Sequence, residues 1–390
     1  ADFLFLRFCQ SRYGLRYPSY RGSATSIDQL RRHIDAYTDG SFWDYYGPSC
    51  QTAVDGVKML RSYVKMERAA QACVLAVLTT VVTPAMAVSL DQYPRLVELA
   101  SRMAGTPGLD SEQIKGWFRD AVIKSNIISA MNRPAERLPW HRYQSLFVNS
   151  ASISGGVQFM KRHAAILTRA QQQYGVPTEI IVAIIGIETR YGKVLGNLRV
   201  LDSLVTLSME YPRRSKFFSS ELEHFLHLVS EQGLDPLSVK GSYAGAMGIP
   251  QFMPSSYREY AVDFDGDGRA DLIHSVADAI GSVANYLAQH RWRSGEPIVT
   301  RVIDPPDELQ AMVTRGLKAQ TPAAKVRALG LPVSAGSGDK LGVMQFDGKM
   351  GIDYRLGHHN FFVITRYNHS QNYAMSVFEL AEQLAVATEN

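Results

Sequence analysis

The chain has 390 residues, of which 46% are hydrophobic and 20% charged, a composition that excludes disordered, collagen-like and multi-span membrane proteins. Its net charge of +4 comes largely from residues 1–87, which carry 10 Lys and Arg against 7 Asp and Glu, whereas the remaining residues carry 31 against 30. Because a protein that binds a phosphate backbone concentrates basic charge on its folded part, nucleic acid is excluded as the main partner.

Residues 66–87 have the layout of a secretory signal peptide. A charged segment, Lys65–Arg68, precedes an apolar stretch from Ala69 to Val82, and Thr83–Ala87 ends in an A-x-A cleavage site. The apolar stretch is short for a membrane span and contains two threonines. The alternative is a buried helix, but the order of the three regions favours export.

The residues before this leader have weak periodicity and predict no domain. We therefore expect residues 1–65 to be a non-native extension, Met66 to be the true start and the mature protein to begin near Val88. All three cysteines precede residue 88, so the mature part has no disulfide, thiolate metal site or cysteine nucleophile. Since Cys73 lacks the small apolar neighbours of a lipidated cysteine, we expect a soluble periplasmic protein rather than a lipoprotein.

Helical patterns dominate residues 90–292. The expected helices are Ser111–Ile128, Gly156–Tyr174, Thr178–Glu188, Pro212–Gln232 and Ser275–His290. Gly175 is a natural residue to follow a helix end, and Pro177 suits the first turn of the next helix. The segment from Thr178 to Glu188 is apolar nearly all round, which is typical of a helix at the centre of a core.

After residue 293 the pattern changes. Five prolines and three short β-rich runs predict a small mixed segment over residues 294–366, and the runs are Ile298–Ile303, Val343–Phe346 and Phe361–Thr365. A last amphipathic helix is expected from Asn372 to Ala387, within residues 370–388. The expected fold class is therefore mainly α (α+β), with a small β-containing part before the final helix.

Glu188 is a candidate general acid. It follows a run of seven aliphatic residues between Ile180 and Ile187, and desolvation beside such a surface raises the pKa of a carboxyl group. A raised pKa is what a general acid needs near neutral pH. The alternative is a structural glutamate, either paired with Arg190 or Arg214 or facing solvent.

A glycine-rich segment, Lys240–Tyr257, is the second candidate. It lacks the spacing of a phosphate-binding loop, but its small residues allow the backbone to approach a ligand closely. Ser242 and Gln251 supply hydrogen-bonding groups for neutral oxygens. The alternative is a loop that only packs between helices.

Several long blocks together resemble the lytic murein transglycosylase B family. The blocks occur in the family's order, from about Leu90 to the C-terminus, and read EIIVAIIGIETRYGKVLGN, LSMEYPRRSKFFSSELEHFL, KGSYAGAMGIPQFMPSSYREYAVDFDGDG, DAIGSVANYLAQHRW and ITRYNHSQNYAMSV. The resemblance implies a lysozyme-like helical catalytic core up to about residue 293, with an additional helical part and a small β-containing part. It also implies cleavage of the β-1,4 bond between N-acetylmuramic acid and N-acetylglucosamine in peptidoglycan, with a 1,6-anhydromuramoyl product.

The resemblance places the family's catalytic glutamate on Glu188. Most glycosidases need two carboxyl groups, but here the sugar supplies the second group. The resemblance implies that Glu188 protonates the leaving oxygen while the 2-acetamido oxygen supports the positive C1, and that Glu188 then accepts the proton of the C6 hydroxyl as this oxygen closes onto C1.

The resemblance also implies a set of substrate-binding residues. Ser242 and Gln251 match polar groups near the cleaved bond. Aromatic rings cover the apolar faces of sugars, and the residues that match the lining of the glycan groove are Tyr143, Tyr286, Tyr367, Asn368 and Tyr373. Without the resemblance, each tyrosine on its own is better explained as part of the core.

An Asp-rich segment predicts a structural calcium ion. Asp263, Asp265 and Asp267 occupy positions 1, 3 and 5 of an EF-hand-like loop, a glycine follows at position 6, and Arg269 offers its carbonyl at position 7. Position 12 is His274 instead of the usual glutamate. The resemblance implies that Asp278 closes the loop, although the spacing here is one residue longer than in the family. The alternative is a turn without an ion.

Two other functions remain open from the sequence. A lysozyme-type muramidase on the same fold delivers water to C1, and a catalytically inactive scaffold only binds peptidoglycan. The presence of Glu188 with Ser242 and Gln251 disfavours the scaffold. We expect glycan strands as substrate, other cell-wall enzymes as partners, a monomer in solution and no organic cofactor.

Overall fold

The computed structural model describes residues 88–133, 138–333, 340–349 and 351–389. These residues belong to one compact unit, Thr83–Asn390. The expected extension and signal peptide, residues 1–65 and 66–87, lie outside the described residues.

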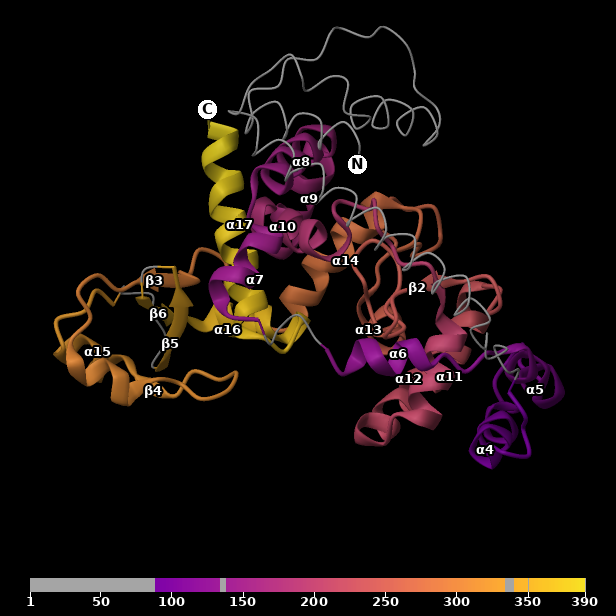
Figure 1. The fold of residues 1–390 in the computed structure, drawn as a ribbon. Coiled ribbons are helices and arrows are strands. Elements are labelled where there is room, and N and C mark those ends of the chain that lie inside the picture. The colour runs from indigo at the N-terminus through magenta and orange to yellow at the C-terminus, as the bar shows by residue number, and fades with distance from the viewer. Residues whose placement is uncertain (1–87, 134–137, 334–339, 350, 390) are drawn as a thin grey trace, which may run out of the picture. The chain divides into compact units, whose positions relative to one another are not determined.

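Helices make up most of this unit (Figure 1). The first group is α4 (Pro94–Met103), α5 (Ser111–Asp120), α6 (Ser125–Met131), α7 (Trp140–Phe147), α8 (Ser150–Arg162), α9 (Ala164–Tyr174) and α10 (Thr178–Thr189). The second group is α11 (Val200–Glu210), η4 (Pro212–Arg214), α12 (Ser215–Gln232), α13 (Pro254–Tyr260), α14 (Val276–Gln289), η5 (Asp307–Met312), α15 (Ala323–Ala328), α16 (His359–Tyr367) and α17 (Gln371–Glu389).

Short polar side chains start several of these helices. Asp110 accepts a hydrogen bond from the backbone N–H of Gln113 at the start of α5, and Asn149 accepts one from Ser152 at the start of α8. Because the first N–H groups of a helix have no partner within it, such caps stabilise a helix by about 1 kcal/mol. Gly175 ends α9 in the left-handed conformation, with φ 71°, as the sequence predicts.

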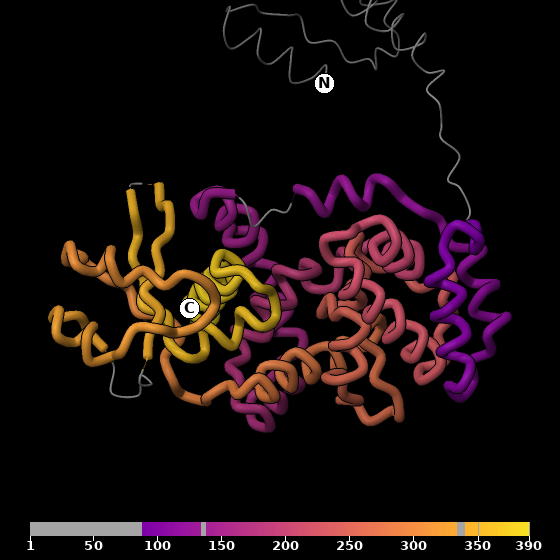
Figure 2. The backbone as a smooth tube through the Cα atoms, turned by 90° about the horizontal axis from the view of Figure 1, so that it is seen from below, coloured from indigo at the N-terminus to yellow at the C-terminus, as the bar shows by residue number. Residues whose placement is uncertain are grey.

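Helix α10 lies at the centre of the core, as its apolar sequence predicts. Its residues 180–186 are buried, and it packs against α8, α9, α14 and α17. Figure 2 shows α17, in yellow, beside the magenta helices of this region. Both views place α4 and α5 on one side of this core and the β-containing part on the other. The centre of the protein is therefore a helix that carries Glu188 at its C-terminal end.

The β-containing part is a four-stranded antiparallel sheet in the order β3-β6-β5-β4. Its strands are β3 (Val299–Arg301), β4 (Thr321–Pro322), β5 (Lys340–Gly348) and β6 (Gly351–Gly357). It has a small core of its own, formed by Val302, Leu309, Ala323, Val326, Leu331, Leu341, Val343 and Leu356. The strands expected within Ile298–Ile303 and Val343–Phe346 are confirmed. The domain boundaries expected near residues 293 and 366 stay a prediction.

The run Phe361–Thr365 is not a strand, and this expectation was wrong. It forms the middle of helix α16, and all five of its residues are buried. A short apolar run surrounded by other elements has no exposed face, so it shows neither the period of a strand nor that of a helix. The final helix, expected within residues 370–388, is confirmed as α17.

Three helices expected to be continuous are each divided in two, and the first of them, Pro212–Gln232, forms the short 3₁₀ helix η4 followed by α12. Ser111–Ile128 breaks into α5 and α6 because Asp202 Oδ1 accepts the N–H of Val122, and Thr206 Oγ1 accepts the N–H of Lys124, each at 3.0 Å. Partners on α11 thus satisfy backbone groups that a continuous helix would bond internally.

Gly156–Tyr174 likewise divides into α8 and α9 at His163, which has φ −113°. Helix α8 packs against α17 whereas α9 packs against α14, so the chain must change direction between them. Neither partner lies close in sequence, and local periodicity therefore predicted one helix where two are found.

Candidate active site and calcium loop

Glu188 is the penultimate residue of α10, and its side chain is partly exposed at the end of an otherwise buried helix. Tyr373, on α17, donates a hydrogen bond from its hydroxyl to Glu188 Oε1 at 2.7 Å. Burial, followed by the negative charge of Glu188, holds the pKa of Tyr373 well above its usual value. Tyr373 therefore stays protonated and remains a hydrogen-bond donor to the carboxylate. The raised pKa expected for Glu188 stays a prediction.

Tyr367 lies next to this pair, at the end of α16. Its ring is nearly parallel to that of Tyr373, with an interplanar angle of 8° and centroids 6.3 Å apart. Its hydroxyl donates to the carbonyl of Pro250 at 2.6 Å. Burial and the charge of Glu188 raise the pKa of Tyr367. Tyr367 thus links the end of α16 to the glycine-rich segment.

Tyr286, on α14, extends this group of rings. It contacts Tyr367 edge-on with centroids 4.9 Å apart, and its hydroxyl donates to the carbonyl of Arg366 at 2.6 Å. Tyr143, on α7, is the remaining expected tyrosine, and its ring packs against that of Phe147 with centroids 5.1 Å apart. Tyr143, Tyr286 and Tyr373 are 1%, 7% and 2% exposed. They present little surface to a sugar here, and their expected glycan contacts stay a prediction, as does that of the partly exposed Asn368.

The glycine-rich segment is held in shape by its own polar side chains. Ser242 Oγ accepts the backbone N–H groups of Ala244 and Ala246, at 3.3 and 3.1 Å. Gln251 adopts a left-handed backbone with φ 52°, and its Nε2 donates to the carbonyls of Leu195 and Gly248. Both side chains are partly exposed. Gln251 therefore joins this segment to the loop after α10.

Thr189 and Tyr191 also fix the end of α10, although neither was predicted from the sequence as a site residue. Thr189 Oγ1 donates to the carbonyl of Ile249 at 2.9 Å, and the Tyr191 hydroxyl donates to that of Ser152 at 2.5 Å. A Cβ on Gly186 would lie 2.7 Å from the Tyr191 ring. The glycines at 155, 156 and 186, within otherwise helical segments, are the sequence signal that predicts such a close approach.

The short sheet β1 (Leu198–Arg199) and β2 (Lys240–Gly241) closes the same region. It pairs the chain after α10 with the start of the glycine-rich segment. The elements around the end of α10 are therefore joined directly by hydrogen bonds. They carry Glu188, Ser242, Gln251, Tyr367 and Tyr373. One ionisable carboxyl group beside buried hydroxyl donors can release and take back a proton.

The Asp-rich segment forms a separate cluster. Asp263, Asp265 and Asp278 each offer an oxygen, and these atoms lie within 4.8 Å of one another. Asp278 is buried at the start of α14, where its Oδ1 accepts the N–H of Phe264 at 2.7 Å and its Oδ2 accepts that of Asp271 at 2.8 Å. Hard carboxylate oxygens in this arrangement suit Ca²⁺.

The remaining positions of the loop behave differently. His274 is 80% exposed and contacts Asp271 through Nδ1 at 2.9 Å, and it is not among the clustered carboxylates. Asp267, expected at position 5, accepts the N–H of Arg269 and also lies outside the cluster of three. The structure thus brings Asp278, rather than His274, to Asp263 and Asp265, and the carbonyl ligand expected from Arg269 stays a prediction.

Comparison with known proteins gives consistent relatives. Membrane-bound lytic murein transglycosylase B of Escherichia coli (strain K12) is 40% identical over 306 residues, which cover 75% of this chain and 83% of that protein. The soluble lytic transglycosylase SltB1 from Pseudomonas aeruginosa is 48% identical with a TM-score of 0.71, covering 76% of this chain and all of that one. Escherichia coli lytic transglycosylase Slt35 in complex with calcium is 38% identical with a TM-score of 0.71, covering 78% and 97%.

These structural neighbours have the lysozyme-like fold, so the expected fold class, mainly helical with a small sheet, is confirmed. A family model described as "Transglycosylase SLT domain" matches residues 92–382, a range that includes every described element of the site. The chain belongs to the transglycosylase SLT domain family, as the resemblance in its sequence predicts.

Proposed function

We propose that this protein is a peptidoglycan lytic transglycosylase that cleaves the β-1,4 bond between N-acetylmuramic acid and N-acetylglucosamine. The observation that carries the proposal is the hydrogen bond from Tyr373 to Glu188, at the end of a buried helix in a chain of this family. It gives one carboxyl group a donor that stabilises the ionised form of that group.

In the proposed reaction Glu188 acts twice. It first gives its proton to the glycosidic oxygen as the bond from that oxygen to C1 of the muramoyl sugar breaks, while the 2-acetamido oxygen supports the positive charge at C1. The resulting carboxylate accepts the proton of the C6 hydroxyl as this oxygen bonds to C1. The proton returns to Glu188, no water is consumed, and the product carries a 1,6-anhydro ring.

The other site residues bind the glycan or hold parts of the site in position. Tyr373 donates to Glu188 as the carboxylate forms. Tyr367 ties the glycine-rich segment to α16, Ser242 braces that segment internally, and Gln251 ties it to the loop after α10. Tyr143, Tyr286 and Asn368 complete the proposed lining of the glycan groove.

The test is digestion of purified peptidoglycan followed by mass spectrometry of the muropeptides. Anhydro ends, lighter than reducing ends by one water, are the expected product, and reducing ends would instead favour a muramidase. Glu188→Gln should lower the rate roughly 10²–10⁴-fold, whereas Glu179→Gln, at the start of the same helix, serves as the matched control. Variant activity equal to wild type would refute the assigned acid. Binding of sacculi without any wild-type cleavage would favour the scaffold.

We also propose that Asp263, Asp265 and Asp278 hold a structural calcium ion, with Asp267 and the carbonyl of Arg269 as further ligands. Support comes from the clustered oxygens, and from the fact that the related Slt35 has been solved in complex with calcium. Such an ion would tie the segment before α14 to the helix start and supply no step of the reaction.

Export through residues 66–87 is the last part of the proposal. In the part of the chain that the structure describes, no helix has both the length and the apolar character to cross a bilayer. N-terminal sequencing of the exported protein should find a start near Val88, and a mature chain that retains Ala1 would refute this. We propose that the periplasmic protein acts on glycan strands as a monomer, together with other cell-wall enzymes, and light scattering tests the monomer.

A further inference from the structure

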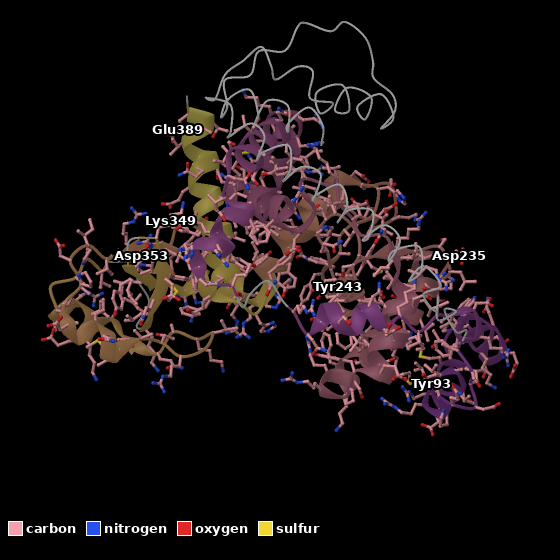
Figure 3. The ribbon with its side chains drawn as sticks, viewed as in Figure 1. Tyr93, Asp235, Tyr243, Lys349, Asp353 and Glu389 are labelled. Carbon is pink, nitrogen blue, oxygen red and sulfur yellow. The ribbon has the colours of Figure 1, made fainter. Side chains whose placement is uncertain are left out.

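The glycine-rich segment has an exposed start and a tightly held second half. Tyr243 is 41% exposed (Figure 3), whereas Ile249 and Phe252 are buried. Within the second half, Gln251 has a left-handed backbone with φ 52°. A residue with a Cβ adopts this conformation at a cost that corresponds to about a tenfold drop in population. The surrounding contacts must therefore hold Gln251 in it.

The conformation of Gln251 decides what this side chain offers to a ligand. Its Nε2 donates to the carbonyls of Leu195 and Gly248, at 3.2 and 2.9 Å. Because only the amide nitrogen can donate to a carbonyl, these two contacts fix the orientation of the amide and turn Oε1 away from both carbonyls. Oε1 then suits a donor on a ligand, such as the N–H of an acetamido group or a hydroxyl of a sugar.

Two contacts fix the chain just before Gln251. Thr189 Oγ1, at the end of α10, donates to the carbonyl of Ile249 at 2.9 Å. The hydroxyl of Tyr367, at the end of α16, donates to the carbonyl of Pro250 at 2.6 Å. The residues that precede Gln251 are thus tied to two helices of the core.

The chain after Gln251 is fixed from α12 by Glu221. Ser255, in the first turn of α13, donates its backbone N–H to Glu221 Oε2 at 3.0 Å and its hydroxyl to Oε1 at 2.7 Å. The residue at the start of α13, Met253, supplies no side-chain cap, so Glu221 satisfies an N–H group that has no partner within the helix. Since Ser255 is four residues after Gln251, the two are at most about 14 Å apart along the chain.

Glu221 differs from the other two glutamates of α12. Glu223 pairs with Arg102, and Glu231 pairs with Arg258, at the surface. Glu221 is 4% exposed, and among the described residues it forms no ion pair. A carboxyl group is costly to bury without a cation unless it is hydrogen-bonded. The two bonds to Ser255 therefore stabilise the buried glutamate and the position of α13 together.

We propose that Glu221 is a positioning residue for Gln251. Its hydrogen bonds to Ser255 hold the chain that follows Gln251, and this keeps the Gln251 backbone left-handed and its Oε1 available to the glycan. The inference rests on the proposed function and deepens it, because it adds a residue that acts on glycan binding through another side chain.

The first test measures binding of the β-1,4-linked tetramer of N-acetylglucosamine to the inactive Glu188→Gln protein. Without its anchor Gln251 leaves the left-handed conformation, and the apparent Kd rises as the competent fraction falls. Glu221→Leu, added to this protein, should therefore raise the Kd about tenfold. Glu221→Gln should restore binding, because its amide oxygen accepts the Ser255 N–H and its amide nitrogen donates to the hydroxyl. Glu223→Gln, on the same helix, is the matched control and should leave the Kd unchanged.

Kinetics separate positioning from a loss of folded protein. On soluble glycan strands, Glu221→Leu in the otherwise wild-type enzyme should raise KM about tenfold and leave kcat unchanged, because saturating substrate recovers the competent conformation. A purely structural role would instead lower the amount of active protein, and with it the apparent kcat at unchanged KM. That result, or an unchanged Kd in folded Glu221→Leu protein, would overturn the inference.

Ser255→Ala is a milder second variant that decides the question if Glu221→Leu does not fold. It removes the hydroxyl that bonds to Oε1 and keeps the backbone N–H, so the Kd should rise roughly two- to tenfold. An unchanged Kd would overturn the inference. A wild-type protein that binds the tetramer but cleaves no glycan would overturn the proposed function, and the comparison of Kd values would still decide the role of Glu221.

Discussion

Tyr373→Phe tests the central contact of the site, because it removes one hydroxyl and leaves the ring. The hydroxyl donates to Glu188 Oε1 at 2.7 Å and is nearly inaccessible to solvent. A hydrogen bond to a charged group contributes about 1.5–3 kcal/mol, and this one strengthens as Glu188 loses its proton in the first step. Its loss should therefore lower kcat roughly 10- to 100-fold.

The pH profile adds a readout that mere destabilisation would not change. A hydrogen bond to the ionised form lowers the pKa of a carboxyl group, so its removal raises the pKa of Glu188. The enzyme needs this acid protonated, and its activity is lost as the pH rises through that pKa. The basic limb of the pH–kcat profile should accordingly move to higher pH, by about one unit for each 1.4 kcal/mol.

A matched buried tyrosine controls for packing. The hydroxyl of Tyr257 donates to the carbonyl of Ala270 at 2.7 Å, so Tyr257→Phe should lower the melting temperature without moving the pH limb. Tyr373→Phe with unchanged kcat and an unshifted limb, in a folded protein, would refute the role given to this hydrogen bond.

Two further predictions concern the calcium loop and the end of α10. Calcium at a hundredfold excess over its Kd should stabilise the chelator-treated protein by about 2.7 kcal/mol. The calcium-induced rise in melting temperature should disappear in Asp263→Asn and persist in the control Asp235→Asn. A wild-type protein whose melting temperature does not rise with calcium would contradict the proposed site. Gly186→Ala places a Cβ 2.7 Å from the Tyr191 ring, so chemical denaturation should show that the free energy of unfolding falls by about 1–3 kcal/mol, and kcat should fall as well. Gly116→Ala is the control, because a Cβ there meets nothing within 4 Å, and it should be neutral or stabilising. Equal effects of the two variants would contradict the close packing of Gly186 against Tyr191.

Local features of the fold were predictable from the sequence. The apolar run of α10 and the glycine that ends α9 act through neighbours within four residues. The break between α5 and α6 was not predictable, because its backbone partners, Asp202 and Thr206, are about 80 residues away. The helical state of Phe361–Thr365 was hidden for a related reason, since a segment buried on every side has no polar face to reveal its period.

The features of the candidate site likewise divide into those that can be predicted from the sequence and those that cannot. A carboxyl group beside seven aliphatic residues is chemically unusual, and this made Glu188 a candidate. The residues alone left a structural glutamate open, and the resemblance to the family assigned the catalytic role. The hydrogen bond from Tyr373 to Glu188 could not be predicted from the sequence. A tyrosine on an amphipathic helix is ordinarily a core residue, and its partner here lies 185 positions away. The resemblance to the family also implied sugar contacts for Tyr143, Tyr286 and Tyr373, which are almost completely buried.

This separation has a consequence for how the site is assembled. Glu188 belongs to a helix whose position is fixed by packing on several sides, whereas its donor arrives on α17, the last helix of the chain. Until α17 packs against α10, the carboxyl group lacks the contact that stabilises its ionised form. Glu188 can be present on α10 in a partly folded chain, but the hydrogen bond that Tyr373 donates to it requires the last helix in place. Catalytic competence and completion of the core therefore depend on the same helix contact.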